Sequence, residues 1–293
     1  MTTTTVRAAL GREVDVRALL RRDVPRILYV AAWAMAAIGL AILVWYLRLY
    51  AMTDFDAHAY WAGARGTALY STGPMTVGAY LYSPAFAQLI RPFALLPWPA
   101  FLGALWVANT SALLWLLRPL GWRWVVPLCL ALSPEVLGGN IFVPLAAMVV
   151  LGFRYPGAWA FSALTKVAPT VMPVWWLVRR EWRPLAVWAA TTAAVVLVSA
   201  TLAPGLWVQW VTLLSQWATE SGRTLGSSRM VPLIYRAPVG LVLLAVGARK
   251  GWRWTVPVAA LLCTPVFWLG SYAWLAAIPR LRASRSPQSR SPA

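Results

Sequence analysis

The chain has 293 residues, of which 60% are apolar and 12% are charged, and its formal net charge is +18. This composition excludes an ordinary soluble domain, and several apolar runs reach the roughly 20 residues that cross a ~30 Å hydrocarbon layer. The arginines lie at the ends of these runs, which favours contact with the membrane and excludes a nucleic-acid-binding protein. We therefore predict an all-α polytopic transmembrane helical bundle of about eight to ten membrane segments.

The amino-terminal part of the chain predicts the orientation in the membrane. Residues 1–26 carry six arginines against three acids and form a predicted cytoplasmic basic arm. The apolar run 27–50 is too long for a signal peptide, so we expect it to carry the chain to the extracytoplasmic face. We place the transmembrane domain at 27–280 and a disordered basic tail at 281–293. The expected location is the plasma (inner) membrane, multi-pass, with a cytoplasmic amino terminus.

Two long outer loops are predicted, at 51–83 and at 204–236. In the first loop the stretch AYWAGARGTALY predicts a short interfacial helix. The runs 124–132 and 141–153 are interrupted by Ser-Pro-Glu and Gly-Gly-Asn, so we expect a broken or re-entrant geometry there. The run 158–178 predicts a continuous span that carries Lys166 in its interior.

The acidic residues narrow the search for a catalytic site. An ionisable side chain within or just above a membrane bundle is a functional candidate by default, because burying it is costly. Four acids remain once the predicted cytoplasmic segments are set aside: Asp54, Asp56, Glu135 and Glu220. Asp54 and Asp56 stand beside the single histidine, His58, in an aromatic-rich loop, and we expect the site there. Asp54 can also be interpreted as the cap of a short helix.

The motifs of this loop and of later segments follow one another in a recognisable order. The loop carries Asp56-x-His58-x-Tyr60-Trp61, and Tyr82-x-Pro84 follows at its end. In this order the motifs resemble those of glycosyltransferase family 87, membrane enzymes of superfamily C (GT-C) that use polyprenyl-phosphate sugars. The later matching motifs are Asn109 in an apolar helix, Gly139-Asn140, Lys166-x-x-Pro169, Ser227-Ser228 before Arg236, and Thr264-Pro265-x-Phe267-Trp268.

The resemblance implies a GT-C-like fold and an inverting glycosyltransferase reaction. A sugar, mannose in our interpretation, would pass from a polyprenyl-phosphate donor to a hydroxyl of a lipid or glycan acceptor at the extracytoplasmic face. The position that matches the general base of the family is Asp56. The alternative is a non-catalytic or degraded paralogue that binds, transports or helps to assemble lipid-linked sugars.

The other candidate residues take their roles from the donor and the acceptor. The donor phosphate needs cations, for which Lys166, Arg236 and Arg229 are the candidates; Lys166 could instead snorkel or pair with Glu135. No cofactor is expected; a divalent cation could bind at Asp54 and Asp56 with the help of substrate phosphate but is not required. The auxiliary, acceptor-binding or sugar-binding candidates are Asp54, His58, Tyr60, Trp61, Tyr82, Asn140 and Trp268.

Overall fold

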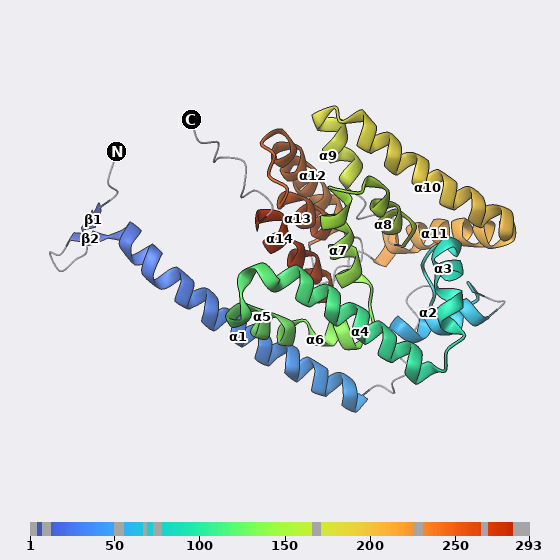
Figure 1. Cartoon of the computed structure of the whole chain (residues 1–293), viewed down its shortest axis with the longest axis horizontal. Helices are drawn as coiled ribbons and strands as arrows, with labels where there is room; N and C mark the ends of the chain where they lie inside the picture. Colours follow the sequence, from blue (N-terminus) through green and yellow to red (C-terminus); the bar gives the residue numbers. More distant parts are fainter. Residues whose placement is uncertain are drawn as a thin grey trace.

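The computed structural model describes residues 5–7, 13–49, 56–66, 69–72, 78–165, 171–224, 231–264 and 269–283, and it is built of helices (Figure 1). The predicted all-α membrane fold is confirmed, with one small antiparallel hairpin, β1–β2, ahead of the first helix. The elements are β1 (Thr5–Arg7), β2 (Glu13–Asp15), α1 (Val16–Leu49), α2 (Asp56–Arg65), α3 (Pro84–Ala94), α4 (Trp98–Leu117), η2 (Arg118–Leu120), α5 (Trp122–Ala131), α6 (Ser133–Leu137), α7 (Phe142–Gly152), η3 (Pro156–Ala158), α8 (Trp159–Thr165), α9 (Met172–Arg179), α10 (Trp182–Leu202), α11 (Pro204–Thr224), α12 (Leu233–Arg249), α13 (Thr255–Leu262), η4 (Leu269–Ala277) and α14 (Ile278–Ala283).

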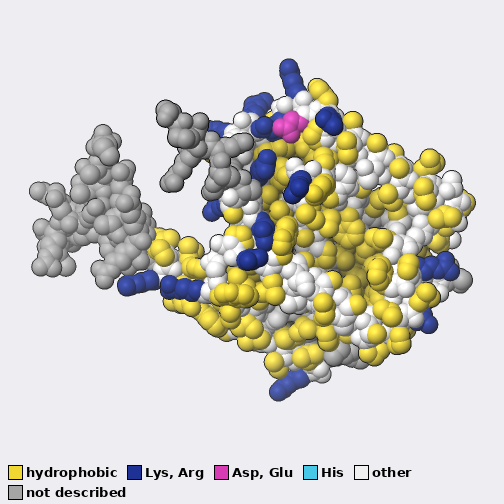
Figure 2. All heavy atoms as spheres, in the orientation of Figure 1, with side chains coloured by type: hydrophobic (Ala, Val, Ile, Leu, Met, Phe, Trp, Pro, Cys, Tyr) yellow, Lys and Arg dark blue, Asp and Glu magenta, His cyan; other side chains and the backbone are white. Residues whose placement is uncertain are grey.

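Three stretches of the described helices are long and apolar enough to cross a membrane: Val24–Trp45 in α1, Trp98–Leu120 in α4 and η2, and Trp182–Leu202 in α10. Most of their surface faces outward, since only 17%, 33% and 6% of these windows is buried inside the protein. Figure 2 shows apolar side chains spread over the surface in wide continuous areas. Such areas are far larger than those of soluble monomers, and a surrounding bilayer accounts for them.

The remaining helices are shorter, and two predictions about them can be compared with the structure. The broken geometry expected at 124–153 is confirmed, because this segment forms α5, α6 and α7 with turns between them. The continuous span expected at 158–178 is wrong. Here α8 ends at Thr165, α9 begins at Met172 and Val171 lies in neither helix, and prolines at 169 and 173 disfavour an uninterrupted helix.

The predicted second outer loop is largely helical, since α11 covers Pro204–Thr224 and α12 begins at Leu233. Trp207, Trp210 and Leu213 recur at three-residue spacing, which places them along one face of α11. The side chains of Trp210 and Leu213 are buried. An apolar face of this kind explains why the segment lies against the bundle as a helix.

Helix α7 lies at the centre of the core. Its side chains Val143, Leu145 and Val149 are fully buried, and the helix packs against α4, α8, α13 and η4. A short helix that is apolar on every side is stable only when other elements surround it. Because Asn140 and Ile141 lead directly into α7, the residues that precede this helix are anchored to the deeply buried part of the fold.

Helix α1 packs along α5 and α6 through small residues. Ala32 and Ala36 are buried on this side, and a Cβ at Gly39 would lie 2.7 Å from the carbonyl oxygens of Leu130 and Ala131. Small residues let membrane helices approach until their backbones touch. The long first helix is thereby fixed at the edge of the bundle, where Figure 1 shows it running along the lower left.

One end of the bundle is basic, and its arginines lie over aromatic rings. Arg280 stacks over Trp115 at 4.4 Å, and Arg253 stacks over Phe153 at 4.8 Å. Figure 2 shows most Lys and Arg side chains in the upper and left parts of the view. The first residues of α2, α3 and α4 and the last residues of α10 lie away from these cations. We call this opposite end the site end.

Candidate active site

Asp56 is the first residue of α2, and its side chain is exposed at the site end. The Nδ2 group of Asn140 donates a hydrogen bond to Oδ2 of this carboxylate. Asn140 is only 3% exposed, and its Oδ1 accepts a hydrogen bond from the backbone N–H of Ile141 at 2.7 Å. The buried amide therefore has a fixed orientation, and it holds one carboxylate oxygen in place while the side chain of Asp56 stays open to the outside.

The backbone on both sides of this contact explains why the two residues meet. The Ala57 N–H donates to the Gly138 carbonyl at 3.3 Å, which ties the first turn of α2 to the turn between α6 and α7. Gly139 has φ +67°, and a Cβ at this position would lie 2.5 Å from the Cβ of Ala57. Only glycine meets both demands. The start of a helix also favours a negative charge such as that of Asp56.

Two tyrosines lie next to the carboxylate. Tyr60 is one turn after Asp56 on the same face of α2, and its hydroxyl is 2.9 Å from the hydroxyl of Tyr82. Burial, the neighbouring tyrosine and the charge of Asp56 raise the pKa of Tyr60, and burial and Asp56 raise the pKa of Tyr82. Both hydroxyls therefore stay protonated at neutral pH, and they can serve as hydrogen-bond donors but not as bases.

Glu135 was considered among the four acids of the sequence but was not assigned to the site. It is 3% exposed on α6, and its charge contributes to the raised pKa of both Tyr60 and Tyr82. The structure thus brings a second carboxylate close to the tyrosine pair. Its position three residues before Gly138-Gly139-Asn140 is the sequence signal that could have identified it.

His58 and Trp61 lie on a different side of α2 from Asp56. Residues two positions apart in a helix, such as Asp56 and His58, differ by about 200° around the helix axis, so the His58 side chain points away from the carboxylate. The His58 ring is 5.0 Å from the ring of Trp98, at the start of α4, and 5.6 Å from that of Trp61. The indole N–H of Trp61 donates to the Leu96 carbonyl at 2.9 Å. The structure therefore gathers Asp56, Tyr60, Tyr82 and Asn140, and it separates His58 and Trp61 from them.

Arg236, in the first turn of α12, binds backbone carbonyls at the end of α13. Its Nη1 donates to the carbonyls of Leu262 and Thr264, both at 3.1 Å, and its Nε donates to the Val231 carbonyl at 2.7 Å. These bonds join two helices and orient the guanidinium. Four other predicted site residues lie outside the described residues: Asp54, Lys166, Arg229 and Trp268.

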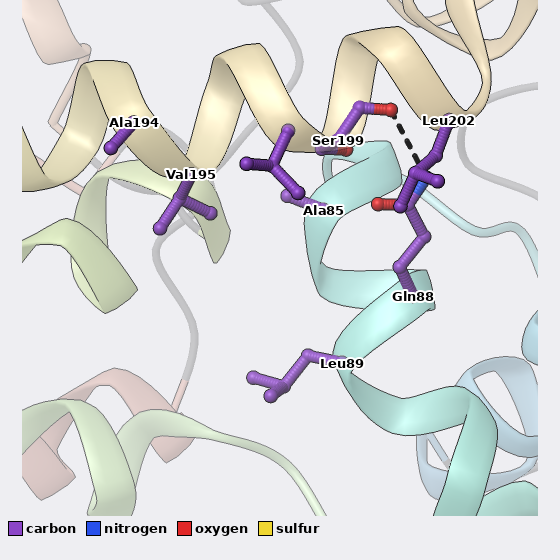
Figure 3. A pocket seen from close by; sticks show the side chains of 8 residues that line it. Ala85, Gln88, Leu89, Ala194, Val195, Ser199 and Leu202 are labelled. Atoms are coloured by element: carbon purple, nitrogen blue, oxygen red, sulfur yellow. Dashed lines mark hydrogen bonds between the residues drawn. The ribbon is translucent and has the colours of Figure 1, made fainter.

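An apolar groove lies between α3 and α10. It has a volume of about 440 Å³, and Figure 3 shows its side chains facing one another across the space between the two helices. The Nε2 group of Gln88 donates to the Ser199 carbonyl at 3.2 Å, which joins the helices. In the same helix α3, the ring of Phe86 is 5.5 Å from that of Tyr60 and 5.4 Å from that of Tyr82. The lining residues of the groove are Ala85, Gln88, Leu89, Ala194, Val195, Val198, Ser199 and Leu202.

Within the described parts of the chain, no three His, Cys, Asp or Glu side chains are grouped so that they could hold a metal ion. Asp54, which would be needed for the predicted paired-aspartate arrangement with Asp56, is not among them.

Comparison with known proteins decides the family. The model of glycosyltransferase family 87 matches residues 80–290, which is well over half of the chain. The chain belongs to glycosyltransferase family 87. No curated protein and no solved structure matches it. The family assignment makes this family 87 protein a membrane glycosyltransferase and confirms the resemblance found in the sequence.

The family match begins after Asp56, yet it includes the residues that hold this part of α2. Asn140 binds the carboxylate and Tyr82 binds the hydroxyl of Tyr60, and both lie within 80–290. In this family 87 protein, α2 is therefore attached to the matched region through these two contacts, through the Trp61 and Arg65 side chains, which bond to the carbonyls of Leu96 and Ala94, and through the backbone of Gly138. The arrangement offers a substrate the exposed carboxylate of Asp56 and the partly exposed hydroxyl of Tyr82.

Proposed function

We propose that this family 87 protein transfers a sugar, with mannose as the first candidate, from a polyprenyl-phosphate donor to an acceptor hydroxyl at the extracytoplasmic face. The observation that carries the proposal is the exposed carboxylate of Asp56, which the buried amide of Asn140 holds in one orientation. A base must lie within about 3 Å of the proton that it removes, so a carboxylate of fixed position is suited to this role.

The reaction is one displacement in which Asp56 acts as the general base. The carboxylate removes the proton of the acceptor hydroxyl, and the acceptor oxygen forms a bond to the anomeric carbon of the sugar. The bond from this carbon to the phosphate oxygen breaks, and polyprenyl phosphate leaves with the electron pair. Attack opposite to the leaving group inverts the configuration. General base catalysis of this kind contributes about 10²–10⁴-fold to the rate.

The tyrosine pair and the groove supply the remaining contacts in this proposal. Tyr82 is partly exposed, and its neutral hydroxyl can bond to a sugar hydroxyl without competing for the acceptor proton, while the buried Tyr60 hydroxyl orients that of Tyr82. The groove between α3 and α10 is apolar and belongs to a membrane-facing helix, which supports a substrate that reaches the site from the bilayer. Lys166, Arg229 and Arg236 remain the proposed partners of the donor phosphate.

The orientation follows the charge of the bundle. Loops rich in Lys and Arg stay on the cytoplasmic side, so we assign the basic end to the cytoplasm and the site end to the outside. This assignment gives a multi-pass protein of the plasma (inner) membrane with a cytoplasmic amino terminus.

The test uses the full-length protein in lipid nanodiscs with radiolabelled polyprenyl-phosphate mannose. We expect Asp56→Asn, which keeps the shape of the side chain, to lower transfer by about 10²-fold or more. The matched control is Glu181→Gln, an acid at the basic end that pairs with Arg179, and it should leave transfer unchanged. Full activity of Asp56→Asn would refute the assignment of the base. Donor binding without turnover by the unmodified protein would favour a non-catalytic lipid-linked-sugar binding protein.

A further inference from the structure

The turn between α4 and α5 lies where a membrane span ends. The span that begins at Trp98 ends at Leu120, at the basic end of the bundle, and the end of a span lies at the level of the lipid headgroups. Trp122, the first residue of α5, is 71% exposed, and an exposed indole is typical of this level. The side chains of this turn therefore lie at the level of the phosphates of the surrounding lipids.

Two arginines from distant parts of the chain meet at this turn. Arg118 lies in η2 and Arg280 in α14, and η2 packs against α14. Nε of Arg280 donates to the Trp115 carbonyl at 2.6 Å, and its guanidinium lies over the Trp115 ring at 4.4 Å. Figure 1 shows α14 next to the end of α4 that carries Trp115. These contacts fix the orientation of Arg280, and the hydrogen bond uses Nε without occupying the two terminal Nη groups.

The two guanidinium groups repel each other. Partial burial and the charge of Arg118 lower the pKa of Arg280, which indicates that the two cations are close enough to interact. Arginine nevertheless keeps its charge at neutral pH. Among the described residues, neither Arg118 nor Arg280 forms an ion pair with an acid. An anion placed between these like charges would therefore replace a repulsion by two attractions.

Apolar side chains accompany the two cations. Leu120 and Trp122 follow Arg118 within four residues, and they are 38% and 71% exposed. A guanidinium can bind a phosphate through two parallel N–H groups, and exposed apolar side chains at this depth can contact acyl chains. A phospholipid offers both kinds of contact in one molecule, whereas a soluble phosphate offers only the first.

We propose that Arg118 and Arg280 form a binding site for the headgroup phosphate of an anionic phospholipid in the leaflet at the basic end. The phosphate accepts hydrogen bonds from both guanidinium groups, and Leu120 and Trp122 contact the acyl chains. Because Arg280 is also bonded to Trp115, the bound lipid joins α14 to the end of α4. This inference goes beyond the proposed function and does not depend on it.

The test measures which lipids the full-length protein retains when it is released from detergent. The purified protein receives equal amounts of phosphatidylglycerol and phosphatidylcholine with the same acyl chains, and native mass spectrometry counts the bound molecules of each. We expect an excess of bound phosphatidylglycerol. Arg118→Gln and Arg280→Gln should each lower the ratio of the two bound lipids about fivefold, since one arginine near an anionic lipid surface contributes about this factor.

The matched control is Arg154→Gln. Arg154 is an exposed arginine that follows α7 and lies over the Tyr155 ring at 5.2 Å, so its replacement changes the net charge by the same amount. We expect it to leave the lipid ratio unchanged. Arg118→Lys keeps the charge but loses the paired N–H groups, and its ratio should lie between those of the unmodified protein and Arg118→Gln.

Three results would overturn the inference. The first is equal retention of the two lipids by the unmodified protein. The second is a loss in Arg154→Gln as large as that in Arg118→Gln, which would mean diffuse attraction by the net charge. The third is displacement of the lipid by an equal concentration of glycerophosphoglycerol, the same headgroup without acyl chains, which would mean a site for a soluble anion. Arg118 is exposed, and its replacement keeps the anchor of Arg280, so the test stands even if Arg280→Gln fails to fold.

Discussion

Replacement of Gly139 by alanine should displace the carboxylate of Asp56, the proposed base, although the two side chains make no direct contact. The backbone at this position has φ +67°, which costs an alanine about 1–2 kcal/mol. The new Cβ would also lie 2.5 Å from the Cβ of Ala57, about 1 Å closer than an ordinary contact, so the first turn of α2 must shift by a similar amount. A displacement of about 1 Å at a reacting group can lower a rate by about 10²-fold. We expect Gly139→Ala to lose transfer activity by that order.

A second substitution separates the steric effect from the backbone strain. Ala57→Gly removes the opposing Cβ, and the nearest remaining atoms to a Cβ at 139 are then the Ala57 Cα at 3.5 Å and a Leu105 methyl at 3.6 Å. The double variant should therefore recover most of the transfer activity while it keeps the loss of stability caused by the positive φ. Activity is measured as initial rates in nanodiscs, and stability is measured as the thermal unfolding midpoint.

The matched control for this experiment is Gly121→Ala. Gly121 has φ +78°, and a Cβ added there would meet no atom within 4 Å, so this position carries the strain without the collision. We expect a similar loss of stability with normal activity. The reasoning is refuted if Gly139→Ala transfers sugar at the normal rate, or if Ala57→Gly fails to improve it.

Two further predictions concern the tyrosine pair and the first helix. The pKa of Tyr82 lies above its usual value of about 10, so its hydroxyl keeps its proton at every pH up to about 10. The rate of Tyr82→Phe should thus be reduced by the same factor from pH 7 to about 9.5, and a rate that converges on that of the unmodified protein near the upper limit would contradict this. Gly39→Leu should separate α1 from α5, because its Cβ would meet backbone oxygens at 2.7 Å, and the unfolding midpoint should fall clearly. Gly103→Leu, where the space is open, serves as its control, and equal midpoints would argue against close packing of α1.

The sequence was sufficient for the class of fold, and it led to the proposal of Asp56 as the base. Long apolar runs with arginines at their ends predict membrane helices directly, and the order of the motifs led to Asp56 and Asn140. Asp56 and Asn140 are 84 residues apart in the sequence, so no local sequence pattern predicts that they are in contact. Their meeting depends on the left-handed turn at Gly139, and a Gly-Gly pair alone does not specify which glycine adopts it.

Two differences have a simple physical origin. His58 was grouped with Asp56 because they are close in a segment treated as a loop, whereas the helical period of α2 turns their side chains apart. The run 158–178 was treated as one span because it is apolar, although Pro169 and Pro173 argue against a continuous helix. Glu135 had only its position before Gly138-Gly139-Asn140 as a signal in the sequence, and the tertiary structure, in which the Ala57 N–H bonds to the Gly138 carbonyl, brings it near Tyr60 and Tyr82.

Helix α10 has a consequence for how family 87 sequences can diverge. Of this helix, which is described over its whole length, Ser199 is the one buried residue, and it accepts hydrogen bonds from Gln88 and Trp207. Exposed positions away from the groove, such as Val187, Ala193 and Leu197, border lipid, where exchange among Val, Leu, Ile and Ala alters no contact inside the protein. Substitutions should accumulate there almost freely, while the turn around Gly139 admits none. Relatives of this protein should accordingly share a few invariant residues, while the amino-acid sequences of their lipid-facing helices differ widely.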